Sequence, residues 1–147
     1  MDLKQRLIND FKDAMKNKDV IAKQTVTMVR AAILFYEKNN KTELDDAGII
    51  DVIASELKKR RESLIEFQKA NRDDLVSQTE EEIKVLMKYL PAQLSDEEIE
   101  SHVIDAIKTA NAQSVKDMGK VMAILMPALK GKADGGKINQ LVKKHLS

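Results

Sequence analysis

Residues 118–147 read MGKVMAILMPALKGKADGGKINQLVKKHLS, a pattern that predicts a helix, a glycine-rich turn and a second helix. The turn is marked by Gly131, Gly135 and Gly136, which lie between two segments with apolar residues at helical spacing. The same stretch is basic, because seven lysines and only two aspartates lie between Lys116 and the end of the sequence. It therefore combines a helical hairpin with a positively charged surface.

The composition of the whole chain favours helices. Aromatic residues make up 3% of the 147 residues, charged residues make up 33%, and there are only five glycines and two prolines. Alanine, leucine, isoleucine, lysine and glutamate dominate, and this mixture favours helix in most windows. A chain of this length can bury one good core or two small ones. We therefore predict an all-α fold with little or no sheet.

Several classes of site are excluded or not expected. The chain has no cysteine, which excludes disulfides, thiol nucleophiles and thiolate metal sites. His102 and His145 have no Asp or Cys at a ligand spacing, so no metal or cofactor is expected. The longest apolar run, Val121–Leu129, is nine residues long, too short for a membrane span. The first residues mix acids and bases without an apolar segment, so we expect no targeting peptide and a cytoplasmic location.

Four helices are expected in residues 1–91. Asp19 is placed to cap the second of them. A third is expected from about Asp46 to Ala70, and a fourth from about Asp73 to Leu90, where Pro91 ends it. The apolar positions expected to face inward are, in chain order, Leu3, Leu7, Phe11 and Met15; Val26, Val29, Ile33 and Tyr36; Ile49, Ile53, Leu57, Leu64 and Phe67; and Leu75, Thr79, Ile83, Leu86 and Leu90.

A domain boundary is expected at Pro91. Ser95 with Glu98 three residues later has the pattern of a capping box, which opens a new helix. The chain is therefore predicted to form an N-terminal helical subdomain over residues 1–91 and a C-terminal one over residues 92–147.

Three short helices are expected in the C-terminal subdomain, with breaks near Asn111 and over residues 130–136. Ser114 with Asp117 resembles a second capping box and would open the helix at Met118. Methionines recur at helical spacing in that helix, either as an adaptable groove or, the preferred interpretation, as gap-filling core. They are Met118, Met122 and Met126.

Three arginines stand beside apolar stripes rather than opposite them. Leu57 and Leu64 define the inward direction of the third helix, and Arg60 and Arg61 fall on either side of it. Arg30 is similarly placed on the second helix, four residues after the apolar Val26. Such guanidiniums must find carboxylates or face a partner. An intramolecular ion pair is the preferred interpretation, and contact with an RNA backbone is the alternative.

The glycine turn has the Gly-x4-Gly-Lys spacing of a phosphate-binding loop between Gly131 and Lys137. Ile138 stands where that loop needs a hydroxyl for magnesium, and the turn follows a helix rather than a strand. An interpretation as a nucleotide hydrolase therefore fails. Two interpretations remain open: Asp134 caps the last helix, or the exposed amides of its first turn, flanked by Lys132, bind an anion.

Seven pieces of the chain carry a family pattern: Leu7–Asp19, Val29–Arg30, Lys58–Ser63, Ala70–Leu75, Tyr89–Pro91, Met118–Met122 and Gly131–Gly135. Through them essentially the whole chain resembles the GatB/YqeY family, most specifically in the last two pieces. Members usually have glycine in the stretch 70–72, where this chain has Asn71. Asparagine tolerates a positive φ better than most residues, so the departure is small.

The resemblance implies a two-part all-helical fold. It also implies contact with tRNA, by analogy with the tail of the B subunit of the glutamine-dependent tRNA amidotransferase. The chemistry of that enzyme lies in a separate domain that this chain lacks, so a carbon–nitrogen ligase label would be inherited from the longer relative. No nucleophile, base or metal cluster is evident. We therefore expect no catalytic residues, no ATP hydrolysis and no transfer of ammonia.

Three function classes remain: an RNA-binding module that prefers tRNA, a protein-interaction adaptor, and an amidotransferase accessory, which is a special case of either and acts in a complex. The net charge is only +1, and residues 1–90 carry seventeen charges of each sign. RNA contact is therefore expected in the C-terminal subdomain. The candidate RNA-binding residues are Lys130, Lys132, Gly135, Gly136, Lys137, Lys143 and Lys144, with Arg30, Arg60 and Arg61 as secondary candidates.

Overall fold

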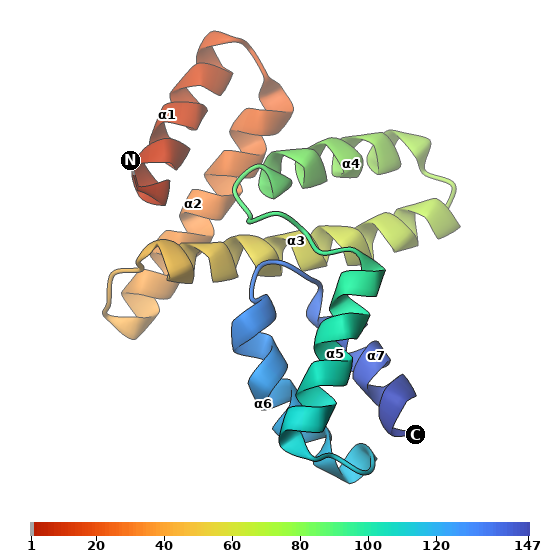
Figure 1. The fold of residues 1–147 in the computed structure, drawn as a ribbon. Coiled ribbons are helices and arrows are strands. Elements are labelled where there is room, and N and C mark those ends of the chain that lie inside the picture. The colour runs from red at the N-terminus through yellow and green to blue at the C-terminus, as the bar shows by residue number, and fades with distance from the viewer. Residues whose placement is uncertain (1) are drawn as a thin grey trace. The chain divides into compact units, whose positions relative to one another are not determined.

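The computed structural model describes residues 2–147, and its regular elements are all helices (Figure 1). In this part of the chain there are seven α-helices, one short 3₁₀ helix and no strand. The α-helices are α1 (Leu3–Lys16), α2 (Val20–Asn40), α3 (Asp46–Lys69), α4 (Asp73–Met87), α5 (Asp96–Ala110), α6 (Met118–Leu129) and α7 (Gly135–Leu146). The prediction of an all-α fold with four helices followed by three is confirmed.

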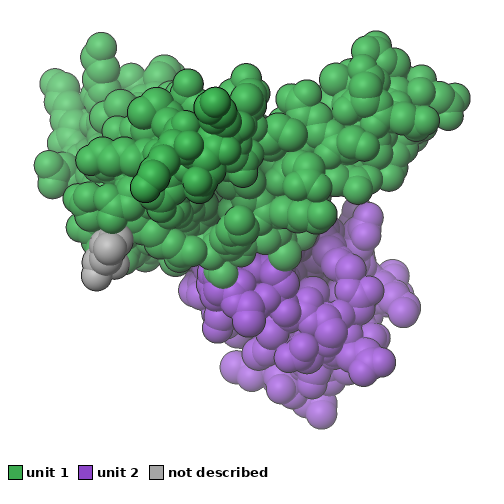
Figure 2. Space-filling model, turned by 90° about the horizontal axis from the view of Figure 1, so that it is seen from above, with its two compact units in different colours: residues 1–90 green, residues 91–147 purple. Residues whose placement is uncertain are grey.

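The chain divides into two compact units, residues 1–90 and 91–147 (Figure 2). The first unit contains α1 to α4, and the second contains α5 to α7. The sequence places its boundary at Pro91, and the structure divides at the bond before it. The fourth helix ends earlier than expected, at Met87, because Tyr89 and Leu90 form turn hydrogen bonds with residues three positions back.

An aspartate caps the N-terminus of three of the four helices in the first unit. The side chain of Asp19 accepts a hydrogen bond from the backbone N–H of Ala22 at 3.1 Å, which confirms its predicted role as a cap. Asp2 and Asp45 cap α1 and α3 in the same way. Because a capping side chain satisfies an amide within its own first turn, these helix starts are decided locally.

One side of each helix forms the core of the first unit. The N-terminal parts of α2 and α3 bury the apolar residues expected there, and Leu86 of α4 is fully buried. The buried apolar cluster consists of Leu7, Val26, Val29, Ile33, Ile49, Ile53, Leu57, Leu86 and Tyr89.

Two predicted core residues are exposed instead. Met15 is 49% exposed, and Ala14 takes the inward position. A repeat of four residues drifts by about 40° at each step around a helix with 3.6 residues per turn, so after three steps it has left the core side. Tyr36 is 45% exposed because it lines a hollow between α2 and α3. Leu64 and Phe67 are half-buried, since the far end of α3 packs against α4 away from α1 and α2 (Figure 1).

Asn71 makes the turn between α3 and α4. Its φ is 56°, in the left-handed region that the family usually fills with glycine. The backbone N–H of Arg72 donates to the carbonyl of Phe67 at 3.0 Å and closes the end of α3. The expectation that asparagine can replace glycine here is consistent with this geometry.

The carboxylate of Glu37 ties α2 to two neighbouring segments. It accepts a hydrogen bond from Lys4 Nζ on α1 at 2.6 Å and one from the backbone N–H of Leu44 at 2.7 Å. Together these bonds, that of Lys4 first, hold the pKa of Glu37 below its ordinary value. Protonation of Glu37 would therefore weaken the junction of α1, α2 and the loop before α3.

We expect the contribution of Glu37 to stability to disappear in acid. A carboxyl whose pKa is lowered by folding stabilises the fold fully above its unfolded pKa of about 4.3, and this stabilisation is lost as the pH falls through the folded value. The melting temperatures of the parent and of Glu37→Gln should be compared from about pH 6 to about pH 3. The difference between them should shrink as the pH falls. A difference that does not change with pH would show that the charge of Glu37 is irrelevant.

The second unit packs α5, α6 and α7 around its own core. The predicted capping box is confirmed: Ser95 Oγ accepts from the backbone N–H of Glu98 at 3.2 Å, and Glu98 Oε1 accepts from that of Ser95 at 3.1 Å. These bonds hold the pKa of Glu98 below its ordinary value. The buried apolar cluster consists of Ile99, Val103, Ala106, Val121, Leu125, Leu129, Ile138, Val142 and Leu146.

The second expected capping box does not form. Ser114 Oγ accepts from the backbone N–H of Lys116, and Asp117 Oδ2 accepts from that of Gln113. Residues Val115–Asp117 form a 3₁₀ helix before α6, and this tighter turn shifts both hydrogen bonds by one residue. Among the methionines of α6, Met118 and Met122 pack against the core as preferred, whereas Met126 is 43% exposed.

Candidate nucleic-acid interface

The turn between α6 and α7 is held by the residues that follow Pro91. Gln93 Nε2 donates to the carbonyl of Gly131 at 2.7 Å and to that of Pro91 at 2.9 Å. The backbone N–H of Leu94 donates to the carbonyl of Lys132 at 2.9 Å. The sequence reasoning missed this anchor, because no local pattern indicates contacts between residues 38 apart. The basic turn is therefore a fixed element of the second unit.

Asp134 caps α7. Its Oδ1 accepts a hydrogen bond from the backbone N–H of Gly136 at 3.2 Å, so a carboxylate already lies where an anion would approach the amides. Of the two open interpretations, the structure supports the cap. Gly131 is the glycine that the backbone requires, with φ 73°. A Cβ on Gly136 would meet only the Asp134 carboxylate, at 3.6 Å, so packing does not demand glycine there.

The five candidate lysines are exposed, on the turn or on α7: Lys130, Lys132, Lys137, Lys143 and Lys144. On α7 the inner side is defined by the buried residues Ile138 and Val142. Lys137 and Lys144 are seven residues apart, so they share one outer side and are about 10 Å apart along the axis. Lys143 lies about 100° around the helix from Lys144.

Carboxylates of α5 neutralise part of this surface. Lys137 Nζ forms an ion pair with Asp96, and His145 Nε2 lies 2.9 Å from Glu100 Oε1. By contrast, three exposed lysines form no ion pair with any residue between 2 and 147. We call these three the lysine edge: Lys132, Lys143 and Lys144.

Arg60 has intramolecular partners. It is 8% exposed, and its guanidinium lies 3.5 Å from the carboxylate of Glu56 and 3.7 Å from that of Glu82. Its Nη2 also donates to the sulfur of Met28 at 3.2 Å. Arg60 Nε is buried without a hydrogen-bond partner among the described residues. For Arg60, the structure therefore favours the preferred interpretation, an intramolecular ion pair.

Arg30 and Arg61 pack on side chains of neighbouring helices. The guanidinium of Arg30 lies 5.5 Å from the centre of the Phe11 ring on α1. Arg61 Nη2 lies 3.7 Å from the sulfur of Met87 on α4. Both arginines are half-buried, and the structure does not bring them together with the lysine edge in one unit.

Tyr89 forms a polar cluster that the sequence reasoning did not single out. Its hydroxyl donates to Asp10 Oδ2, and the Arg6 guanidinium lies 4.7 Å from the centre of its ring. Burial, followed by the hydrogen bond to Asp10, raises the pKa of Tyr89 far above its ordinary value. The phenol therefore stays protonated and joins α1 to the end of α4, which indicates a structural role.

Neither a metal signature nor a membrane signature is found among the described residues. Between residues 2 and 147 no three His, Cys, Asp or Glu side chains are grouped so that they could hold a metal ion. No described helix has the length and apolar character that a membrane span requires.

Residues 4–146 match the protein family described as Yqey-like protein. The chain belongs to this family. The resemblance to the GatB/YqeY family is thereby confirmed. A similar protein is "Altered inheritance of mitochondria protein 41, mitochondrial" of Pyrenophora tritici-repentis (strain Pt-1C-BFP), 30% identical over 131 residues that cover 87% of this chain and 71% of the relative.

The protein of the same name in Kluyveromyces lactis is 36% identical over 105 residues, 69% of this chain and 56% of the relative. That of Candida glabrata is 33% identical over 90 residues, 57% of this chain and 47% of the relative. The chain thus spans between 47% and 71% of the lengths of these relatives.

The expectation of a cytoplasmic location is contradicted, because these relatives are named as mitochondrial proteins. That expectation rested on composition and on the first residues of the sequence. Compartment is set by targeting segments that receptors read, and the composition of a folded domain carries little of that information.

Proposed function

We propose that this YqeY-like protein binds the phosphate backbone of a folded RNA, with tRNA as the preferred class, through the lysine edge of its second unit. The observation that carries the proposal is the exposure of Lys132, Lys143 and Lys144 without carboxylate partners in the described chain. Lysines that are not neutralised by neighbours can replace the counterions of phosphates. The anchored turn fixes the position of Lys132 before any ligand arrives.

The side chains around the lysine edge specify the kind of contact. Residues 91–147 contain no phenylalanine, tyrosine or tryptophan, so this unit has no ring on which a base could stack. Lysines hold phosphates as point charges and do not read base edges in the deep groove of an RNA helix. The preference for tRNA rests on the resemblance to the amidotransferase tail, which is an argument by analogy.

We expect weak, salt-sensitive binding to unmodified tRNA. Three to five phosphate contacts correspond to a slope on the order of −2 to −4 in a plot of log affinity against log salt concentration. The triple change of Lys132, Lys143 and Lys144 to glutamine should reduce that slope by roughly 2 to 3, about one for each contact removed. Filter binding or fluorescence anisotropy across a salt series would measure both slopes.

A matched control removes three exposed lysines from the first unit, namely Lys12, Lys23 and Lys38, also as glutamines. Its net charge equals that of the test variant, so a general charge effect would lower both affinities alike. Binding of tRNA by the test variant with the parent's slope, or no binding by the parent at low salt, would refute the proposal. Lys137 is omitted because its substitution would also break the ion pair with Asp96.

A protein-interaction role, including that of an amidotransferase accessory, is the second candidate. It is favoured by exposed apolar side chains on α2 of the first unit, where Leu34 is 65% exposed and Phe35 is 69% exposed. Failure of the RNA experiment would make this the leading function.

A further inference from the structure

Arg30 on α2 has no carboxylate partner among the described residues. Its guanidinium lies 5.5 Å from the centre of the Phe11 ring, but it forms no ion pair with any residue between 2 and 147. The side chain is half-buried, so water reaches its charge only in part. A charge that is partly removed from water is stabilised by an opposite charge that replaces the lost hydration. Arg30 is therefore placed to bind an anion that the described chain does not supply.

Arg30 lines a hollow between α1 and α2, which lie side by side as an antiparallel pair (Figure 1). We call it the α1–α2 hollow. Its volume is about 160 Å³, and most of its wall is formed by apolar side chains, namely Leu7, Ile8, Ile33 and Leu34. A cavity of about 150 Å³ with leucine and isoleucine walls is large enough to hold benzene. The α1–α2 hollow therefore has the size and the lining for a hydrocarbon group of about six carbons.

An ion pair occupies the end of the α1–α2 hollow that is remote from Arg30. Lys4 and Glu37 line the hollow there, and Lys4 Nζ lies 2.6 Å from Glu37 Oε2. Glu37 follows Arg30 by seven residues, so the two residues are about 10 Å apart along the axis of α2. Two cations and one carboxylate leave a net charge of +1 around the hollow. A ligand with a single negative charge would neutralise it, with that charge at the Arg30 end.

We propose that the α1–α2 hollow is a binding site for a small apolar monocarboxylic acid with a chain of about six carbons. The carboxylate pairs with the guanidinium of Arg30, whose planar fork can donate two parallel hydrogen bonds to it. The hydrocarbon chain lies on the apolar wall, between Leu7 of α1 and Leu34 of α2. Leu34 is 65% exposed, so the bound chain removes apolar surface of Leu34 from water. The proposal is independent of RNA binding, which rests on the lysine edge.

The test is isothermal titration calorimetry of the full chain with hexanoate. For a ligand of about eight non-hydrogen atoms, a dissociation constant between about 0.1 mM and 10 mM is expected. Affinity should rise roughly fourfold for each methylene group from butyrate to hexanoate, and octanoate should gain no more than about fourfold in total because the hollow is then full. Hexanamide has the same size without the charge and should bind at least about tenfold more weakly than hexanoate.

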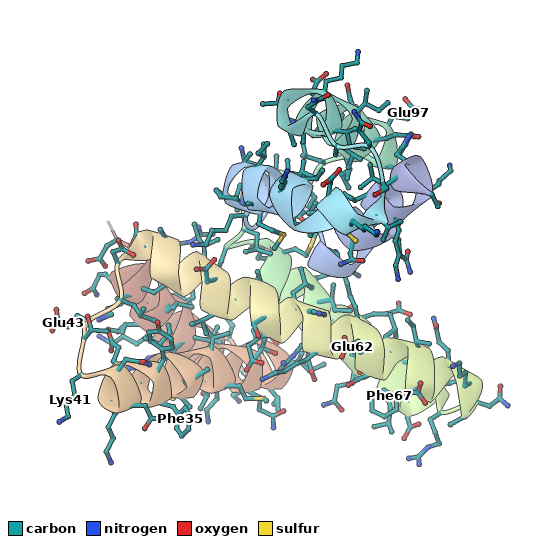
Figure 3. All side chains as sticks on the ribbon, turned by 90° about the horizontal axis from the view of Figure 1, so that it is seen from below. Phe35, Lys41, Glu43, Glu62, Phe67 and Glu97 are labelled. Carbon is teal, nitrogen blue, oxygen red and sulfur yellow. The ribbon has the colours of Figure 1, made fainter. Side chains whose placement is uncertain are left out.

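Two variants locate the site, each with a matched control. Arg30→Gln should weaken hexanoate binding at least about tenfold, the effect of losing a hydrogen-bonded charge pair. Its control is Arg61→Gln, because Arg61 is likewise half-buried but contacts Met87 of α4. Leu34→Glu should abolish binding, because it gives Arg30 a carboxylate four residues away on the same helix. Its control is Phe35→Glu: Phe35 is 69% exposed, projects outward from α2 in Figure 3 and does not line the α1–α2 hollow.

Both controls should bind hexanoate like the parent, and far-ultraviolet spectra should show that all four variants are folded. If Arg30→Gln does not fold, Leu34→Glu decides alone, since Leu34 is exposed and its substitution leaves the core intact. A parent that binds no hexanoate at about 20 mM, well above the expected range, would overturn the proposal. Binding by Leu34→Glu with the parent's affinity, equal losses in the controls, or equal affinities for hexanoate and hexanamide would also overturn it.

Discussion

Replacing Arg60 with alanine is expected to lower the free energy of unfolding of the first unit by about 3–5 kcal/mol. The side chain is 8% exposed and lies between the carboxylates of Glu56 and Glu82, at 3.5 Å and 3.7 Å. Removing it leaves two acids close together without their buried cation, and Glu56 is itself only 8% exposed. Urea denaturation of the parent and of Arg60→Ala measures the difference.

The control for this prediction is Lys59→Ala. Lys59 contacts the same carboxylate, with its Nζ 3.5 Å from Glu56, but its side chain is 70% exposed. Solvent screens that pair, so its loss should change the free energy of unfolding by no more than about 0.5 kcal/mol. If Arg60→Ala lowered the free energy of unfolding no more than Lys59→Ala does, the buried ion pair would not account for the presence of Arg60 at this position. Contact of Arg60 with an RNA backbone would then be the better interpretation.

Leu125→Ala is expected to destabilise the second unit by about 2–5 kcal/mol and to leave the first unit folded. Leu125 is 2% exposed in the core of the second unit, and the cavity left by its removal is confined to that core. Limited proteolysis of this variant should degrade residues after the joint and leave a stable fragment that ends near Pro91 to Ser95.

The matched change in the other unit is Leu86→Ala, at a position with 0% exposure in the first core. It should produce the opposite pattern, in which the first unit is digested and a fragment beginning near Pro91 survives. Simultaneous loss of both units in either variant would show that the chain unfolds as one cooperative body and would refute the two-subdomain proposal.

Much of the local structure could be predicted from the sequence, because its causes lie within a few residues. Asp19 and the Ser95–Glu98 pair satisfy amides in their own first turns, so their identity suffices to locate α2 and α5. The cap at Asp134 follows the same rule. Prediction failed where the local rule was too coarse, as at Met15, where a repeat of four residues drifts away from the core side.

The candidate site could be predicted only in part. The sequence indicated five basic residues around the last turn but not which of them remain unpaired. Lys137 is paired by Asp96, a residue of α5, whereas Lys132 has no such partner in the described chain. The hydrogen bond from Gln93 to Gly131 could not be predicted from the sequence either, because it joins residues 38 positions apart.

The sequence by itself determined the helical class, most helix starts and the family, since propensity, capping and motif spacing act over short stretches of chain. Only the tertiary structure decided the environment of each charge. Arg60 is buried because α4 brings Glu82 to α3, and Phe35 is exposed because it lines an open hollow between α2 and α3. Burial and pairing depend on which distant side chains packing brings within a few ångströms, and no local pattern specifies those neighbours.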